Sequence, residues 1–341
     1  MASSQSEFSD RPERSRRIAW ALLAKAAVTL AIFCFLFLRL DMAACLAAIQ
    51  ASFGGWLMGA AMANSAPLVL SMLKWDQLLR ALHIVVSRWE LLRVYMIGFF
   101  VSSFLPGVFG GDVVRCYITA MGESSRMNVA ATILVERFTG IVALVIMCVV
   151  AVAADHSRLA TVPTLLLLGS MTCALVGSLF LSTSRRLAVS LTYRTRRWKF
   201  ARVIRLFYDL HRTFRGFSRR DFLVSVVFSV VFYFSGGLVF FCVCRAFGTG
   251  LGFSEVLTVQ LLVCLLTVLP ISVGGLGLAQ AGDVYLLGIL GVDAPTALGM
   301  SFTRKLIQYL YVCLGGACFI RWQGRSRVAR ATRVPEDQLE V

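Results

Sequence analysis

Six mostly apolar stretches of about 20 residues dominate the sequence and constrain its fold more than any other feature. They cover residues 18–38, 54–73, 131–153, 162–182, 222–243 and 296–320. A helix of that length matches the hydrocarbon thickness of a bilayer. The composition, with 58% hydrophobic and 15% charged residues, is also far from that of a water-soluble domain. We therefore expect an all-α integral membrane protein with six full spans.

Two further apolar segments, residues 91–104 and 256–269, are too short to cross a bilayer unaided. Each is followed at once by a proline, a glycine cluster and another short apolar piece. This pattern predicts the two arms of a re-entrant helical hairpin. Six spans and two such hairpins give about eight membrane segments.

The two hairpins share one motif and so indicate an internal repeat. Leu105-Pro106-x-x-x-Gly110-Gly111 and Leu269-Pro270-x-x-x-Gly274-Gly275 have the same spacing. They divide the chain into halves, residues 18–153 and 162–320, that each run span, span, hairpin, span. An odd number of crossings inverts the second half, so the hairpins should enter from opposite faces. Inverted repeats with broken helices are typical of secondary transporters. The motif glycines either line a substrate path or only permit tight turns and close packing.

Basic residues predict the orientation of the chain. They are concentrated in the N-terminal arm, the two long connections and the tail, residues 1–17, 74–90, 183–221 and 321–341. The positive-inside rule places these segments, and both termini, in the cytoplasm. The segment 183–221 also reads as a basic amphipathic helix, which fits either simple topology or specific binding to anionic lipid. The formal net charge of +16 points to a membrane partner, because no nucleic-acid-binding motif is present.

The first glycine motif is followed by a pair of opposite charges. Asp112 and Arg115 are three residues apart, and this spacing puts them on one side of a helix. Free amides after Gly110 and Gly111, with the Arg115 guanidinium, would form a phosphate site. In the alternative, Asp112 caps the helix and holds Arg115 in place.

Ionisable residues within the predicted spans are the next candidates. Glu136, Arg137 and Arg304 are costly in hydrocarbon, so they either face a cavity or snorkel to the interface. The second motif carries candidate polar contacts of its own, at Ser272, Gly274, Gly275 and Gln280. The histidines and cysteines show no metal-ligand spacing, so we expect no metal site, no cofactor and no catalytic residue.

The chain resembles the transmembrane, flippase-like domain of lysylphosphatidylglycerol synthases. The residues that carry the resemblance are Leu105-Pro106-Gly107-x-x-Gly110-Gly111-Asp112-x-x-Arg115, Val135-Glu136-Arg137, Leu269-Pro270-Ile-Ser272-x-Gly274-Gly275-x-Gly277, Gly291-Val292 and Ala297-Leu298. The resemblance implies a bacterial inner-membrane protein that handles aminoacylated phospholipids or other lipid-linked molecules. It implies headgroup contacts for Asp112, Arg115 and Arg137. Where relatives often carry a basic and then an acidic residue, this chain has Ala279 and Gln280.

These observations favour a flippase or transporter that moves a phospholipid or polyprenyl-linked amphiphile. The alternatives are a membrane-embedded transferase, with Asp112 or Glu136 as base, and an accessory subunit that presents lipid to a lipid-modifying enzyme. The tail is expected to leave no room for a soluble aminoacyltransferase or glycosyltransferase domain, so we lean toward a protein that is not an enzyme.

Overall fold

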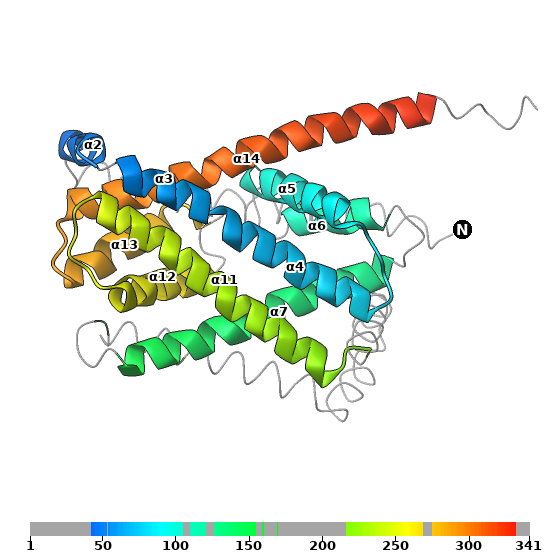
Figure 1. Cartoon of the computed structure of the whole chain (residues 1–341), viewed down its shortest axis with the longest axis horizontal. Helices are drawn as coiled ribbons and strands as arrows, with labels where there is room; N and C mark the ends of the chain where they lie inside the picture. The colour runs from blue at the N-terminus through cyan, green and yellow to red at the C-terminus, as the bar shows by residue number, and fades with distance from the viewer. Residues whose placement is uncertain are drawn as a thin grey trace, which may run out of the picture.

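The computed structural model describes ten helices of this chain (Figure 1). The described residues are 42–52, 54–104, 110–120, 126–154, 159, 169, 216–268 and 275–331. The helices are α2 (Met42–Gln50), α3 (Gly54–Ala63), α4 (Ser65–Ala81), α5 (Arg88–Phe104), α6 (Gly110–Thr119), α7 (Arg126–Ala154), α11 (Arg219–Ala246), α12 (Phe253–Val268), α13 (Leu278–Ile289) and α14 (Ala294–Ala331). The predicted span 18–38, the predicted span 162–182 except residue 169, and the amphipathic part of segment 183–221 lie outside these residues.

Three stretches of the described chain are long and apolar enough to cross a membrane, and each contains a predicted span. They are Gly54–Ala81, Arg126–Ala154 and Arg219–Ala246. Helix α14 contains the predicted span 296–320 but is not among them, so the count of six remains a prediction.

The helix α4 runs further than the sequence predicted. The basic connection was expected over residues 74–90, but α4 continues to Ala81 and buries Lys74 inside the protein. Because a charged residue in a span usually marks its end, the prediction stopped the helix at Lys74. Only residues 82–87 remain as the connection to α5.

Both predicted hairpins contain paired short helices. Helix α5 has 17 residues and α12 has 16, which correspond to about 25 Å each and so fall short of a bilayer core. Helix α6 returns along α5, where the Gly111 amide donates to Ser102 Oγ at 3.1 Å. Helix α13 returns along α12, and Gly282 lies against Val263 and Leu266. The turns themselves, residues 105–109 and 269–274, are outside the described part.

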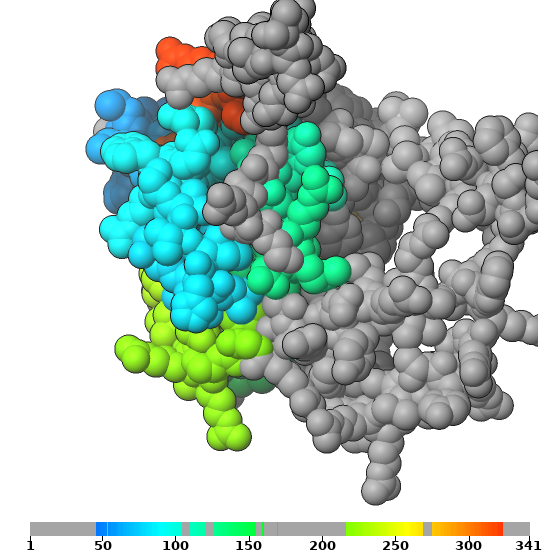
Figure 2. All heavy atoms as spheres, turned by 90° about the vertical axis from the view of Figure 1, so that its right-hand side faces the viewer, coloured from blue at the N-terminus to red at the C-terminus, as the bar shows by residue number. Residues whose placement is uncertain are grey.

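The hairpins lie toward opposite ends of the long helices. In Figure 1, α12 and α13 lie at the left and α5 and α6 toward the right. The right end also holds the end of α4 and the starts of α7 and α11. Figure 2 views this end and shows residues of the α4–α5 region directly above the first residues of α11.

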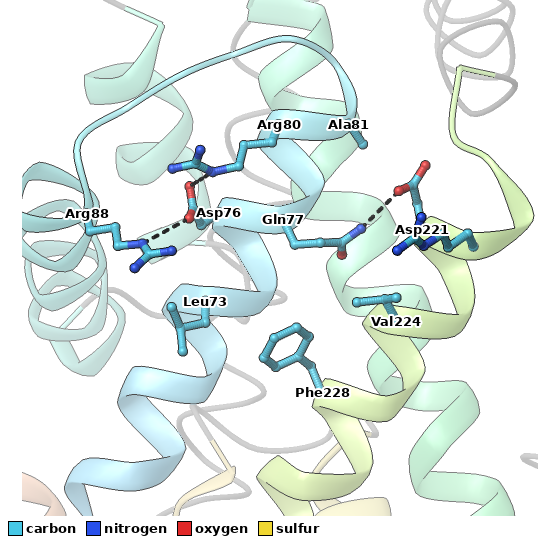
Figure 3. Close-up of a pocket in the computed structure, with 10 residues that line it drawn as sticks. Leu73, Asp76, Gln77, Arg80, Ala81, Arg88, Asp221, Val224 and Phe228 are labelled. Atoms are coloured by element: carbon cyan, nitrogen blue, oxygen red, sulfur yellow. Dashed lines mark hydrogen bonds and ion pairs between the residues drawn. The ribbon is translucent and has the colours of Figure 1, made fainter.

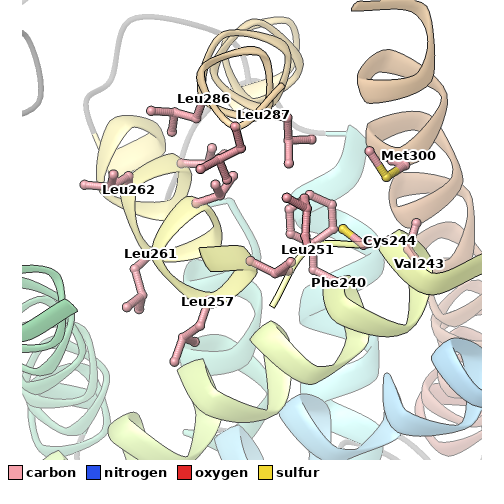
Figure 4. Packing of buried hydrophobic residues seen from close by; sticks show 14 of the residues in the cluster. Phe240, Val243, Cys244, Leu251, Leu257, Leu261, Leu262, Leu286, Leu287 and Met300 are labelled. Carbon is pink, nitrogen blue, oxygen red and sulfur yellow. The ribbon is translucent and has the colours of Figure 1, made fainter. Parts of the chain in front are cut away.

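The bundle has two large apolar cores among its described residues, one around each hairpin. One core joins α11, α12 and α13 to parts of α7 and α14, and includes Phe240, Leu261 and Leu287 (Figure 4). The other joins α4, α5, α6 and the first half of α7, around Trp75 and Leu91. The end of α14 closes this second core against α5. Each hairpin therefore packs into a core of its own.

Candidate functional site

Arg115 lies at the centre of a buried set of charges in the first half. Its guanidinium contacts Asp112 of its own helix α6 at 3.3 Å, as the three-residue spacing predicted, and Glu136 of α7 at 2.7 Å. The rings of Trp75 and Tyr95 lie on it, 4.1 and 4.0 Å from the guanidinium carbon. Cation–π contacts of this kind strengthen when they are shielded from water. Arg115 is therefore fixed on several sides by protein groups.

Two further cations complete what we call the charge cluster, made of Lys74, Asp112, Arg115, Glu136 and Arg137. Arg137 binds the second Asp112 oxygen at 2.8 Å. Lys74 donates to the Glu136 carbonyl oxygen at 2.6 Å and to Ser229 Oγ of α11 at 2.7 Å. Three cations thus face two carboxylates, which leaves an excess of one positive charge.

Access to solvent differs sharply between the two arginines. The Arg115 side chain is 5% exposed, whereas that of Arg137 is 47% exposed. Glu136 is buried inside the bundle. Its side chain therefore does not extend to the membrane interface, which was the snorkelling alternative. Arg137 is the most exposed group of the cluster.

At the start of α6 the structure corrects the expected free Gly111 amide and the expected cap, and it confirms that Asp112 holds Arg115. The Gly111 amide is bound to Ser102 Oγ, so it is not free for an anion. Asp112 lies inside the first turn of a helix that begins at Gly110, so it does not cap the helix, and its carboxylate binds Arg115 and Arg137. Gly111 has a packing role, because a Cβ there would collide with Ser102 and the Gly98 backbone.

The second half carries a smaller set of polar contacts around Arg304 of α14. Its guanidinium binds Asp283 of α13 at 2.7 Å and also Gln260 of α12. Asp283 is fully buried and accepts a hydrogen bond from Ser301. Sequence reasoning gave a role to Arg304 but none to Asp283, whose partner becomes visible only once α13 packs on α14.

The other residues expected at the second motif contribute less. Gln280 is buried, and its Oε1 accepts from the Gly277 amide at 2.8 Å, so the side chain caps its own helix. Gly275 has a φ of +74°, which favours glycine. Ser272 and Gly274 lie outside the described residues.

The two sets have the same spacing in the sequence. Arg115 and Glu136 are separated by 21 residues in sequence, and so are Asp283 and Arg304. In each half the pair joins the returning helix of the hairpin to the next long helix, with the charges exchanged. No hydrogen bond or ion pair links the two sets within the described ranges, so they form two sites and not one continuous network.

Lys74, Trp75 and Tyr95 were missed as site residues by the sequence reasoning. Lys74 was assigned to a cytoplasmic loop, and the polar residues that follow it, Asp76, Gln77 and Arg80, gave no signal that the helix continues. The two rings carried no signal, because their role depends on how α4 and α5 face Arg115. Among the described residues, no group of three His, Cys, Asp or Glu side chains is placed to bind a metal.

The bundle has charged residues in its interior and apolar residues on its surface, the reverse of a water-soluble protein. Charges lie inside, while α11 presents an exposed apolar stripe made of Leu223, Val227, Val231, Phe234 and Leu238. Helix α14 does the same with Leu306, Leu310 and Leu314. Water-soluble proteins keep such charges outside and rarely expose continuous apolar faces. The fold and site together define a multi-pass helical membrane protein.

The family follows from a comparison with protein-family models. The model for the lysylphosphatidylglycerol synthase TM region matches residues 22–316, and the chain belongs to this family. The family is associated with phospholipid modification and flipping. A search of curated proteins found no match to the chain.

Proposed function

We propose that this protein is a lipid flippase or transporter, and that Arg137 receives the headgroup of a phospholipid or lipid-linked amphiphile. The observation that carries the proposal is the depth of the charged residues in both halves. Glu136 is ten residues into α7, which begins at Arg126, and Arg304 is ten residues into α14, which begins at Ala294. Counted from the expected spans 131–153 and 296–320, Glu136 is five residues in and Arg304 eight residues in, which correspond to about 8 and about 12 Å of helix inside the hydrocarbon.

The two long helices start at opposite ends of the bundle (Figure 1), so each charged set lies inside the bundle at a distance from a different end. Ionisable groups inside a membrane are costly and usually mark a pathway. The arrangement matches the inverted repeats of transporters, where rocking of one half against the other moves a central site between the two faces.

Within this proposal the groups of the cluster have different tasks. Asp112 holds Arg137 from one side, and the half-exposed guanidinium keeps donors for a phosphate oxygen. Arg115, enclosed by rings and carboxylates, fixes Asp112 and Glu136 and does not itself bind the headgroup. The membrane would be the bacterial inner membrane, with the basic end of the bundle and both termini on the cytoplasmic side.

A transferase is not favoured by the geometry. A general base needs a carboxylate that is free to take a proton. Asp112 and Glu136, the two groups considered for that role, are each held by guanidinium groups.

The test is headgroup-dependent translocation in liposomes that contain the full chain. Acyl-labelled phosphatidylglycerol is followed by dithionite quenching, with Arg137→Gln as the variant and Arg93→Gln as the matched control. Arg93 has a comparable exposure of 38% and an ion pair with Glu90 outside the cluster. We expect about tenfold slower translocation for Arg137→Gln, the equivalent of one lost charge-assisted hydrogen bond, and an unchanged rate for Arg93→Gln.

Equal rates for the wild type and Arg137→Gln would refute the assigned role of Arg137. Wild-type liposomes no faster than protein-free ones would refute transport. In that case, co-purification with a lipid-modifying enzyme would favour an accessory subunit.

A further inference from the structure

A cavity of about 610 Å³ lies between the last turns of α4 and the first turns of α11 (Figure 3). It is lined by Leu73, Asp76, Gln77, Arg80, Ala81, Arg88, Arg220, Asp221, Val224 and Phe228. None of these residues belongs to the charge cluster. The volume is typical of small-molecule sites.

The cavity and the charge cluster use different faces of α4. Leu73, Gln77 and Arg80 follow the helical spacing of one face and line the cavity. Lys74 and Trp75 point to the cluster instead. The cavity lies at the end of the bundle where α4 ends and α11 begins, the end to which the sequence assigns the cytoplasmic side. It is therefore a separate site at a membrane face.

The polar lining of the cavity carries more positive than negative charge. Arg80 and Arg88 share a single carboxylate, Asp76, at 2.9 and 3.6 Å. The second carboxylate, Asp221, is engaged by Ser218 in the capping box of α11. No ion pair is recorded for the exposed Arg220 in the described part of the chain. The lining thus has three guanidinium groups and two carboxylates that already have partners, which favours the binding of an anion such as a phosphate.

The lining also offers an acceptor without a donor. The Gln77 amide nitrogen donates to Asp221 at 3.2 Å, but Gln77 Oε1 is buried and has no hydrogen-bond partner among the residues that the structure describes. A buried polar atom in this state costs free energy until a donor reaches it. A ligand that carries a hydroxyl or ammonium group beside its phosphate would satisfy it.

The remaining walls are apolar. In Figure 3, Leu73, Val224 and Phe228 lie below the charged groups, with Leu73 beneath Arg88 and Val224 beneath Asp221. One cavity therefore combines a cationic end, an unsatisfied acceptor and an apolar end, which together match an amphiphile and not a free ion.

We propose that this cavity binds one phospholipid whose headgroup carries a hydrogen-bond donor next to the phosphate. The phosphate contacts Arg220 and the other two arginines of the lining, Arg80 and Arg88. The headgroup donor reaches Gln77 Oε1, and the first acyl carbons lie against Leu73 and Phe228. This site is distinct from the transport path, and its occupancy does not depend on translocation.

The test is native mass spectrometry of the full chain in detergent, with added phosphatidylglycerol or phosphatidylcholine of the same acyl chains. Both lipids have a phosphate, but only phosphatidylglycerol has headgroup hydroxyls. The variant Arg220→Ala is compared with Arg219→Ala, an exposed neighbour that does not line the cavity. Phe228→Trp, which fills the apolar end, is compared with Val227→Trp, whose side chain is on the exposed stripe.

We expect Arg220→Ala and Phe228→Trp to weaken phosphatidylglycerol binding by about fivefold to tenfold, and both neighbours to change it less than twofold. Gln77→Leu should remove the preference for phosphatidylglycerol over phosphatidylcholine. Equal losses for Arg219→Ala and Arg220→Ala would show non-specific attraction and overturn the proposal. Binding of soluble glycerophosphoglycerol as tightly as the lipid would overturn the assignment to a lipid. Because only binding is measured, a failure here leaves the transport proposal unaffected.

Discussion

The substitution Glu136→Gln removes one negative charge from the cluster and little else. Glutamine has nearly the same shape, and its amide oxygen can still accept the hydrogen bond that Tyr95 OH donates to Glu136 at 2.9 Å. Arg115 and Lys74 lose their nearest carboxylate, and Asp112 remains 3.3 Å from Arg115. The excess charge of the cluster rises from one to two.

Removing one partner of a buried ion pair typically costs 3 to 5 kcal/mol, about 3 here because Asp112 compensates in part. The matched control is Glu90→Gln. Glu90 also pairs with an arginine, Arg93, but the two side chains are 41% and 38% exposed. An exposed pair is worth about 0.2 to 1 kcal/mol, so the control should lose less than about 1 kcal/mol.

The assay is equilibrium unfolding of the full chain in mixed micelles with increasing dodecyl sulfate, followed by circular dichroism. We expect the free energy of unfolding to fall about 2 to 3 kcal/mol further for Glu136→Gln than for Glu90→Gln. Equal losses would refute the reasoning, because they would mean that water screens the charges of the cluster as well as those at the surface.

Three further predictions concern other parts of the fold. Gly111→Ala should destabilise the chain by about 1 to 3 kcal/mol, because its Cβ would meet the α5 backbone, whereas Gly288→Ala has open space and should be neutral or stabilising in the same unfolding assay. A double-mutant cycle of Asp283→Asn and Arg304→Gln should give a coupling free energy above about 1 kcal/mol. A value near zero would show that the two side chains do not stabilise each other. Asp293→Ala should cost about 1 kcal/mol, because the carboxylate accepts the Thr296 amide at the start of α14. That hydrogen bond lowers the pKa of Asp293 in the folded state. The contribution of Asp293 to stability should therefore be present above about pH 3.9, the pKa of an unfolded aspartate, and should be lost as the pH falls through the lower pKa of the folded state. An unfolding free energy that stays constant on acidification would contradict this prediction.

The sequence predicted the features that depend on local spacing. The short helices beside each Leu-Pro motif follow from length and from proline and glycine. The contact between Asp112 and Arg115 follows from a three-residue separation on one helix. The long apolar helices α7 and α11 were placed to within a few residues at each end.

Features that depend on packing between helices were not predictable in the same way. Asp283 finds Arg304 and Lys74 finds Glu136 only because α13 meets α14 and α4 meets α7. The contact of Gln280 with a substrate stays a prediction, and the sequence did not reveal that its side-chain oxygen accepts a hydrogen bond from the Gly277 amide. Neither composition nor motif reveals that a nearby backbone donor binds such a side-chain oxygen.

The central claim is that Arg137 is on a path which lipid headgroups follow from one face to the other. The most direct measurement is the accessibility of Arg137→Cys, in a chain whose ten native cysteines are replaced, to a membrane-impermeant thiol reagent in proteoliposomes. The account predicts labelling from each face in turn, slowed by phosphatidylglycerol and not by diacylglycerol. Labelling from one face only, with no protection by phospholipid, would contradict it.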